Sequence, residues 1–344
     1  MKLRDYVIRR LLLLIPVLIG VSIITFALTR LVGDPSAIYV SERCLDTPGC
    51  VEGIRRQYGF DQPIPVQYAK YMQGLLGGDL GYSQAARLPV TEAIARKFPA
   101  TVELATASML FAIAVGIPMG VVSATRRNRP IDHATRIVAL SGVSIPVFWL
   151  GLMLQVVFYA QLGILPVSQR AATELYAVPG AAVPAITNFY VLDSILVLRG
   201  DGLVDAIKHL ILPAIALGFV TMAPIVRMMR SSMLEVLNQE YIKTARSKGL
   251  SEKVVIRKHA RRNALIPTTT VIGLSFGGLL GGAVLTETIF DWPGVGQWSA
   301  DAITELDPAA IMGFTLLAAV IYVLANLVVD VLYAYLDPRI RLGE

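Results

Sequence analysis

Six apolar runs, each about as long as a membrane-spanning helix, constrain this chain more than any other feature of its sequence. A helix needs about 20 apolar residues to cross a hydrocarbon core roughly 30 Å thick. The runs occupy residues 11–31, 101–124, 137–162, 210–229, 265–289 and 311–336. Because 55% of the 344 residues are hydrophobic and only 16% are charged, the composition excludes an ordinary soluble enzyme. We predict an all-α membrane protein with six transmembrane helices.

A seventh apolar stretch, residues 177–198, is not counted as a span. It contains Pro179, Pro184, Asn188 and Asp193, and unsatisfied polar groups are costly in lipid. The first run is interpreted as a retained helix, because it is too long for a signal peptide and no A-x-A cleavage site follows it.

The distribution of basic residues predicts the orientation of the spans. If the N-terminus is cytoplasmic, 20 of the 31 Lys and Arg residues fall in inside segments, ten of them between residues 227 and 262. Short cytoplasmic loops are enriched in Lys and Arg. We therefore expect a multi-pass protein of the cell membrane with both termini in the cytoplasm, in contact with membrane lipid and not with nucleic acid.

This topology divides the chain into four parts. They are an N-terminal transmembrane helix (1–32), an extracellular segment (33–100), a core of five transmembrane helices (101–336) and a cytoplasmic tail (337–344). The core includes an extracellular loop after the third helix (163–209) and a cytoplasmic loop after the fourth (230–264). Long extracellular loops are thus expected after helices 1 and 3.

The two cysteines, Cys44 and Cys50, both lie in the first extracellular segment. Asp46, Pro48 and Gly49 between them favour a turn, and an oxidising compartment permits a disulfide. A local disulfide is one interpretation, and two free thiols are the alternative. A metal site is not expected, because the segment contains no His and a zinc ion needs more ligands than two sulfurs.

The sequence contains no convincing motif for enzymatic catalysis. No G-x-x-x-x-G-K-[ST] phosphate loop occurs, so this chain is not expected to hydrolyse ATP. Residues 273–277 match G-x-S-x-G, but a nucleophile elbow needs a preceding strand and these residues lie inside a predicted span. Closely spaced glycines allow helices to approach one another. We therefore predict a helix-packing role for Gly273, Gly277, Gly278, Gly281 and Gly282.

Polar groups within the spans are few, which argues against a carrier driven by intramembrane carboxylates. Asn326 and Asp330 are four residues apart and share a face of the last predicted helix. Gln155 lies in the third predicted span. For these three residues, a polar contact between helices and a place along a transport pathway both remain open.

The cytoplasmic loop contains the most specific pattern. Residues 240–248 are good helix formers, Gly249 is a natural helix stop, and Ser251 can cap a second helix that begins near Glu252. These features predict two short helices joined by a tight bend.

The surface of this bend suits a partner protein. We expect Leu250 to project from it, while Tyr241, Ile242, Ala245 and Ile256 form a mixed surface that fits a groove. The alternative is a basic loop that lies on anionic lipid.

The spacing of Glu240, Ala245, Gly249, Ile256 and Pro267 resembles the E-A-A…G…I…P loop of permease subunits of binding-protein-dependent ABC importers. The sequence of the loop is similar to that of the B-type subunit of the dipeptide and oligopeptide branch. Lys243 and Thr244 depart from the older form of the motif, which has Glu-Ala-Ala at its start. Residues 98–105, 287–296 and 337–341 also resemble blocks of this branch.

This resemblance implies the type I ABC importer permease fold and a set of partners. They are a second permease that completes a heterodimer, two cytoplasmic ATPase subunits that bind ATP and Mg, and an extracellular solute-binding protein. The loop residues Glu240, Tyr241, Ala245, Gly249, Leu250, Ile256 and Pro267 would couple this chain to an ATPase. The chain itself would be neither an enzyme nor a cofactor-binding protein.

The cargo implied by the resemblance is a dipeptide or oligopeptide. Permeases of the same branch that carry oligosaccharide, glutathione or nickel are the alternative. A membrane-embedded enzyme or an independent channel would need paired catalytic groups or a charged filter ring, and the sequence shows neither.

Overall fold

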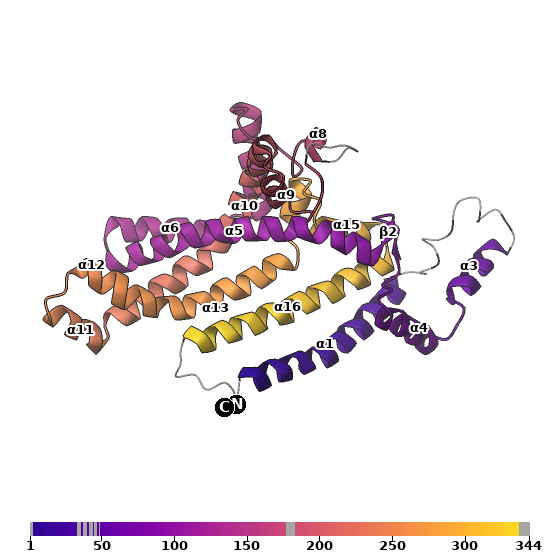
Figure 1. The fold of residues 1–344 in the computed structure, drawn as a ribbon, viewed down its shortest axis with the longest axis horizontal. Coiled ribbons are helices and arrows are strands. Elements are labelled where there is room, and N and C mark those ends of the chain that lie inside the picture. Colours follow the sequence, from indigo (N-terminus) through magenta and orange to yellow (C-terminus); the bar gives the residue numbers. More distant parts are fainter. Residues whose placement is uncertain are drawn as a thin grey trace.

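The computed structural model describes residues 3–32, 36, 40, 44, 47, 49–176 and 183–336. Figure 1 shows long helices that lie side by side, with α11 at one end of the layer and α3 and α4 beyond the other. We call the end that holds α11 the loop end and the opposite one the far end. A separate lobe with α8 and α9 projects from the side of the layer near α5.

The long helices are α1 (Leu3–Val32), α5 (Val90–Thr125), α10 (Gly200–Leu237), α13 (Arg261–Leu280) and α16 (Pro308–Leu336). The remaining helices are α3 (Cys50–Tyr58), α4 (Ile64–Leu76), α6 (Pro130–Ser144), α7 (Val147–Gln155), α8 (Thr173–Tyr176), α9 (Tyr190–Leu196), α11 (Glu240–Ser247), α12 (Glu252–Val254), α14 (Val284–Ile289) and α15 (Val295–Thr304). Two π-helical turns, η2 (Val156–Gln161) and η3 (Val255–Ala260), continue α7 and α12. Two short strands, β1 (Tyr82–Ser83) and β2 (Leu88–Pro89), pair antiparallel.

The described part of the chain confirms the predicted all-α membrane architecture. Five helices are long and apolar enough to cross a membrane, and a bent pair makes six if it is one span. The buried residues gather where these helices meet, with one cluster at the loop end around Met229 and Ile242 and another at the far end around Val90 and Trp298.

The third predicted span, 137–162, is broken and not straight. α6 and α7 meet at an angle of 102°. Pro146 has no N–H to donate and forces the preceding residue out of the helical region, and Ile145 is extended with φ −83° and ψ 123°. The prediction of a single continuous helix here was therefore wrong.

Other span boundaries also differ from the prediction. Residues 90–100, expected to be extracellular, form the beginning of α5. The predicted fifth span, 265–289, ends already at Leu280, because Gly282 adopts φ +104°, a conformation that ends the helix. In the described part of 177–198, α9 is seven residues long, far too short to cross a membrane. The predicted tail 337–344 lies outside the described residues.

Two of the five predicted packing glycines let α13 lie against α16. A Cβ atom added to Gly273 would overlap Val329, and one added to Gly277 would lie 2.5 Å from the Cβ of Ala325. Gly282 closely approaches Gly296, with 3.0 Å between its added Cβ and the Gly296 Cα.

The other two glycines do not contact another helix in the described part of the chain. Gly278 faces open space, and the nearest atoms to an added Cβ on Gly281 belong to the backbone of α13 itself. Neither glycine therefore contributes to a contact between helices in the described part of this chain, and a packing role for them stays a prediction.

Replacing Gly277 by Ala is expected to lower the thermal stability of the purified protein by about 1–3 kcal/mol, because an added methyl group overpacks the α13–α16 contact. Thermal unfolding in detergent measures the effect. Gly278→Ala is the matched control, with open space for the methyl group and a better intrinsic helix propensity. Equal shifts in the two variants would contradict the contact.

Candidate functional site

The short helix α11 is fixed to the loop end of the helix layer by its inner face. Ile242 is completely buried and Ala245 is 7% exposed, and both belong to the same cluster as Met229, Val255 and Ala264. These partners come from α10, η3 and α13. Because Ile242 and Ala245 are three residues apart, they share one face of the helix. α11 therefore moves with the long helices and is not a free loop.

A sharp bend follows α11 at Gly249, as predicted. Gly249 has φ +77°, a left-handed conformation that residues with a Cβ atom disfavour. Its N–H donates to the carbonyl of Arg246 at 2.9 Å, and the N–H of Leu250 donates to the carbonyl of Ala245 at 3.4 Å. This pair of bonds is the usual way in which glycine ends a helix.

The chain after the bend differs from the prediction in two ways. The next helix begins at Glu252, but the hydroxyl of Ser251 makes no capping hydrogen bond. The helix is also not a separate short one, because residues Glu252–Leu280 form one continuous membrane-crossing segment. Pro267 lies inside α13, within this segment. The bend thus connects α11 directly to the fifth span.

The exposed large apolar side chains of the loop are Tyr241, Leu250 and Val254, which are 42%, 40% and 38% exposed. Leu250 and Tyr241 point outward as predicted. Ile242, Ala245 and Ile256 were also predicted to share this surface, but all three pack inward against the bundle. Their places there follow from the contact with α10 and α13, which the local sequence does not reveal.

An ion pair that the sequence analysis missed spans the bend. The guanidinium of Arg246 donates to both carboxylate oxygens of Glu252, at 3.1 and 2.7 Å. Both side chains are exposed, so the pair adds little to stability. Its two bonds instead hold α11 and α12 in one relative orientation, as bidentate arginine pairs do. A spacing of six residues has no helical periodicity, and so gave no signal.

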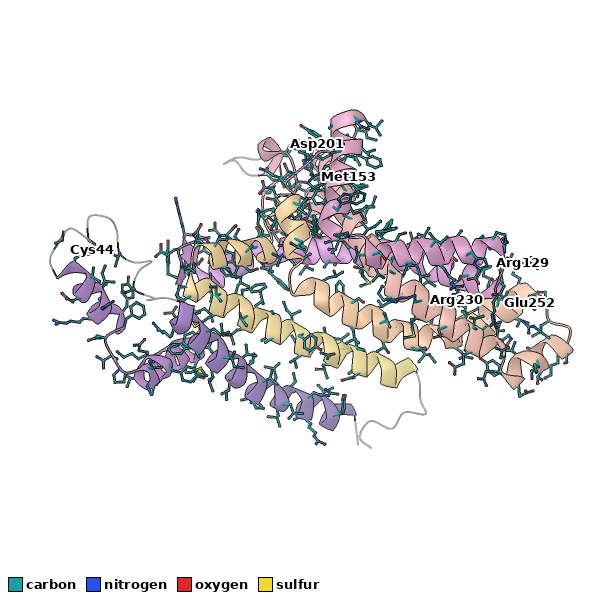
Figure 2. The ribbon with its side chains drawn as sticks, turned by 180° about the vertical axis from the view of Figure 1, so that it is seen from behind. Cys44, Arg129, Met153, Asp201, Arg230 and Glu252 are labelled. Atoms are coloured by element: carbon teal, nitrogen blue, oxygen red, sulfur yellow. A yellow bond between two sulfur atoms is a disulfide. The ribbon has the colours of Figure 1, made fainter. Side chains whose placement is uncertain are left out.

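A buried network supports the site where α5, α6 and α10 meet. Arg230 donates from Nε to Asp132 Oδ1 at 2.9 Å and from Nη2 to Oδ2 at 3.0 Å. Ser123 and the backbone N–H of Asn128 complete the shell around the fully buried Asp132. Figure 2 places Arg230, Arg129 and Glu252 at the same end of the molecule. This network fixes α6 to α10 close to the loop.

A second buried ion pair holds the projecting lobe on α5. Arg170 donates from Nη2 to Glu103 Oε2 at 2.6 Å, with the two side chains 4% and 8% exposed. The other oxygen of Glu103 accepts the N–H of Val191 at 2.9 Å. The guanidinium lies 3.9 Å from the centroid of the Tyr190 ring. We call Glu103 and Arg170 the lobe latch.

Within the lobe, Tyr176 joins three segments through its hydroxyl group. Its hydroxyl donates to the carbonyl of Gly202 at 2.9 Å and also contacts Ser194. Burial raises the pKa of Tyr176 above its ordinary value, so the hydroxyl remains a neutral donor. Met153 and Asp201 mark the projecting lobe in Figure 2.

A third buried carboxylate, Glu287, joins α14 to the start of α15. Its Oε1 accepts the hydroxyl of Thr101 at 2.8 Å, and its Oε2 accepts the N–H of Gln297 at 2.9 Å. The N–H of Val295 donates to the hydroxyl oxygen of Thr101 at 2.9 Å. The free N–H groups at the beginning of α15 are thus satisfied from two other helices.

The polar residues singled out in the spans make helix contacts. Asp330 accepts the hydroxyl of Tyr6 at 2.8 Å and pairs with Arg10 at 2.9 Å, which joins α16 to α1. Gln155 donates to the carbonyls of Val167 and Ile289.

Asn326 differs, because it donates to the carbonyl of Tyr322 in its own helix. It makes no hydrogen bond to another helix in the described part of the chain.

The remaining candidates concern covalent and metal chemistry. Cys44 and Cys50 are joined by a disulfide, with their Cα atoms 5.4 Å apart. Ser275 lies inside α13, without the strand that a nucleophile elbow requires. Among the described residues, no group of three or more His, Cys, Asp and Glu side chains could hold a metal ion.

Comparison with known proteins agrees with the motif in the loop. Residues 116–342 match the family described as binding-protein-dependent transport system inner membrane component. Residues 3–105 match the N-terminal family of the same membrane components.

Similar curated proteins cover nearly the whole chain. A dipeptide transport system permease protein of Alkalihalophilus pseudofirmus is 47% identical over 98% of this chain and 99% of that protein. A probable D,D-dipeptide transport system permease protein of Escherichia coli is 46% identical over 96% and 95%. A glutathione transport system permease protein of Escherichia coli is 38% identical over 98% and 99%. The chain therefore belongs to the inner membrane components of binding-protein-dependent transport systems, the permease family that the loop between α10 and α13 predicts.

Proposed function

We propose that this chain is the B-type permease subunit of an ATP-driven importer that moves dipeptides or oligopeptides across the cell membrane. A solute-binding protein delivers the peptide outside, a second permease completes the pathway, and two separate ATPase subunits bind ATP and Mg. The two dipeptide permeases are 46% and 47% identical to this chain, whereas the glutathione permease is 38% identical. This difference supports peptide as the cargo.

The observation that carries the proposal is an exposed apolar patch on a rigid support. Tyr241, Leu250 and Val254 face outward, whereas Ile242 and Ala245 anchor the same short segment in the bundle. A patch of this kind fits a groove on a partner and transmits the partner's movement to α10 and α13. Two packings of these helices that differ little in energy could then be selected by ATP on one side and loaded binding protein on the other.

The proposed orientation places the loop end in the cytoplasm. The start of α1 and the end of α16 lie toward the loop end in Figure 1, and Tyr6 and Asp330 connect them. Both termini would then be cytoplasmic, and the lobe with α8 and α9 would serve the entry side.

Replacing Leu250 by Asn is expected to weaken the binding of the ATPase subunits about tenfold or more, because burying a leucine side chain contributes roughly 1.5–3 kcal/mol. Co-purification of the ATPase with the permease pair measures the loss, and uptake of a labelled dipeptide into proteoliposomes should fall with it. Leu76→Asn is the control, since Leu76 is also an exposed leucine, at 85% against 40% for Leu250, but lies on α4 at the far end.

Two outcomes would count against this function. Normal ATPase binding by the Leu250→Asn complex would remove the patch from the interface. Uptake that unlabelled glutathione blocks and unlabelled dipeptide does not would exclude peptide as the cargo while leaving the coupling site intact.

A further inference from the structure

A cavity of about 540 Å³ lies between α6 and α10, near the loop end, and plays no part in the coupling patch. His133 and Arg136 of α6 and Arg227 and Arg230 of α10 line one side of it. No carboxylate is among the described residues that line the cavity. We call this cavity the α6–α10 groove. Its charge is strongly positive.

Two of the three arginines in the groove have no carboxylate partner in the described part of the chain. Arg230 is paired with the buried Asp132. Arg136 and Arg227 are exposed, and neither forms an ion pair with any residue in the described ranges. A guanidinium is protonated at every physiological pH and binds phosphate through two parallel hydrogen bonds. The groove thus presents two guanidinium groups to an anion.

The remaining wall of the groove is apolar. Ile137, Leu140 and Val143 line it and are 65%, 64% and 53% exposed. These three residues are spaced three apart along α6, and Leu140 and Val143 lie four and seven residues after Arg136, so they line the face of the helix that Arg136 begins. This face therefore changes from basic to apolar with distance from the loop end. A ligand that fits it has an anionic group at one end and a hydrocarbon part at the other.

The groove has a fixed shape, because α6 is held on α10 at both ends of the apolar wall. Near the loop end the bidentate Asp132–Arg230 pair joins the helices. Further along, Gly142 permits a close approach, since an added Cβ there would lie 2.8 Å from the carbonyl oxygen of Phe219. A preformed site of this kind loses little entropy when it binds a ligand.

We infer that the α6–α10 groove binds an anionic phospholipid, with the phosphate between Arg136 and Arg227 and one acyl chain along Ile137, Leu140 and Val143. Basic pockets between helices near the cytoplasmic surface recognise anionic headgroups. A soluble anion would neutralise the two arginines without contacting the apolar wall, and a neutral lipid would contact the wall without neutralising the arginines. In the orientation proposed above, this lipid belongs to the cytoplasmic leaflet.

The test uses the assembled importer in nanodiscs of phosphatidylcholine with increasing fractions of phosphatidylglycerol. Bound phosphatidylglycerol is counted by native mass spectrometry for the wild type and for the double variant Arg136→Gln/Arg227→Gln. Each arginine near an anionic surface strengthens binding roughly fivefold, so the double variant is expected to bind about thirtyfold more weakly. Because neither arginine has an ion-pair partner in the described part of the chain, the variant is expected to fold and assemble normally.

Arg126→Gln/Arg127→Gln is the matched control. Both residues are exposed in the turn between α5 and α6 and lie outside the groove, so the same charge is removed from the same end of the molecule. An equal loss of lipid in both double variants would overturn the inference, because it would show general attraction to the membrane surface and not a site.

A photo-crosslinking amino acid in place of Leu140 identifies the occupant directly in membranes. An adduct with phospholipid is expected. An adduct with the second permease would overturn the inference and make the groove a contact between subunits. Neither readout depends on the cargo, so a failure here leaves the proposed transport function untouched.

Discussion

Replacing Gly249 by Val is expected to abolish most peptide uptake while the protein still inserts into the membrane and assembles. Gly249 has φ +77°, and the bend depends on this conformation. A residue with a Cβ atom costs roughly 1–2 kcal/mol in the left-handed region, and a β-branched side chain costs more. The bend would then relax, and α11 and α12 would lose the relative orientation that the Arg246–Glu252 pair holds. ATP hydrolysis should continue without transport.

The control for this variant is Gly249→Asn at the same position. Asparagine tolerates the left-handed conformation, and no atom lies within 4 Å of an added Cβ at Gly249. Space is therefore not the constraint, and Gly249→Asn should retain uptake. The measurements are labelled dipeptide uptake and ATPase activity of the reconstituted importer. Normal uptake by Gly249→Val would show that the bend does not need a left-handed residue.

Replacing Arg170 by Met is expected to destabilise the protein by about 3–5 kcal/mol, because the charge of Glu103 would remain buried without a partner. The lobe latch also positions Val191 through Glu103. Its loss should release residues 183–199 from α5. Hydrogen exchange in this segment and the thermal unfolding midpoint in detergent report the two effects.

Two further variants distinguish the destabilisation caused by an unpaired buried charge from the destabilisation caused by losing a contact. The double variant Glu103→Gln/Arg170→Met removes both charges and should recover much of the lost stability. Arg199→Met removes an arginine from the exposed pair with Asp201 in the same lobe, where an ion pair contributes little to stability. If Arg170→Met shifted the unfolding midpoint no more than Arg199→Met, the lobe latch would have no structural role.

The sequence predicted those parts of the fold that depend on local chemistry. The apolar runs indicated the membrane helices, because only a helix satisfies its own backbone groups in lipid. Gly249 indicated the bend, because glycine adopts a positive φ more readily than residues with a Cβ atom. Pro146 also carried a local signal for the break between α6 and α7. The span was predicted as continuous because hydropathy does not register a bend.

The contacts of the site could not be predicted in the same way. Arg170 and Glu103 are 67 residues apart in the chain, and Thr101 and Glu287 are 186 apart. No spacing rule connects residues on different helices, so neither pair was found. Likewise, Ile242, Ala245 and Ile256 were assigned to the outer surface, because an amphipathic segment does not specify which of its neighbours will cover it.

The sequence by itself therefore determined that this chain is a helical membrane protein and where the loop between α10 and α13 bends, because hydrophobicity, charge and backbone freedom act over a few residues. Only the tertiary structure decided which loop residues remain exposed, which carboxylates are buried with a partner, and how the basic and apolar residues of α6 meet α10 in one groove. These features arise when helices pack, since packing brings together side chains that are distant in sequence and excludes water between them.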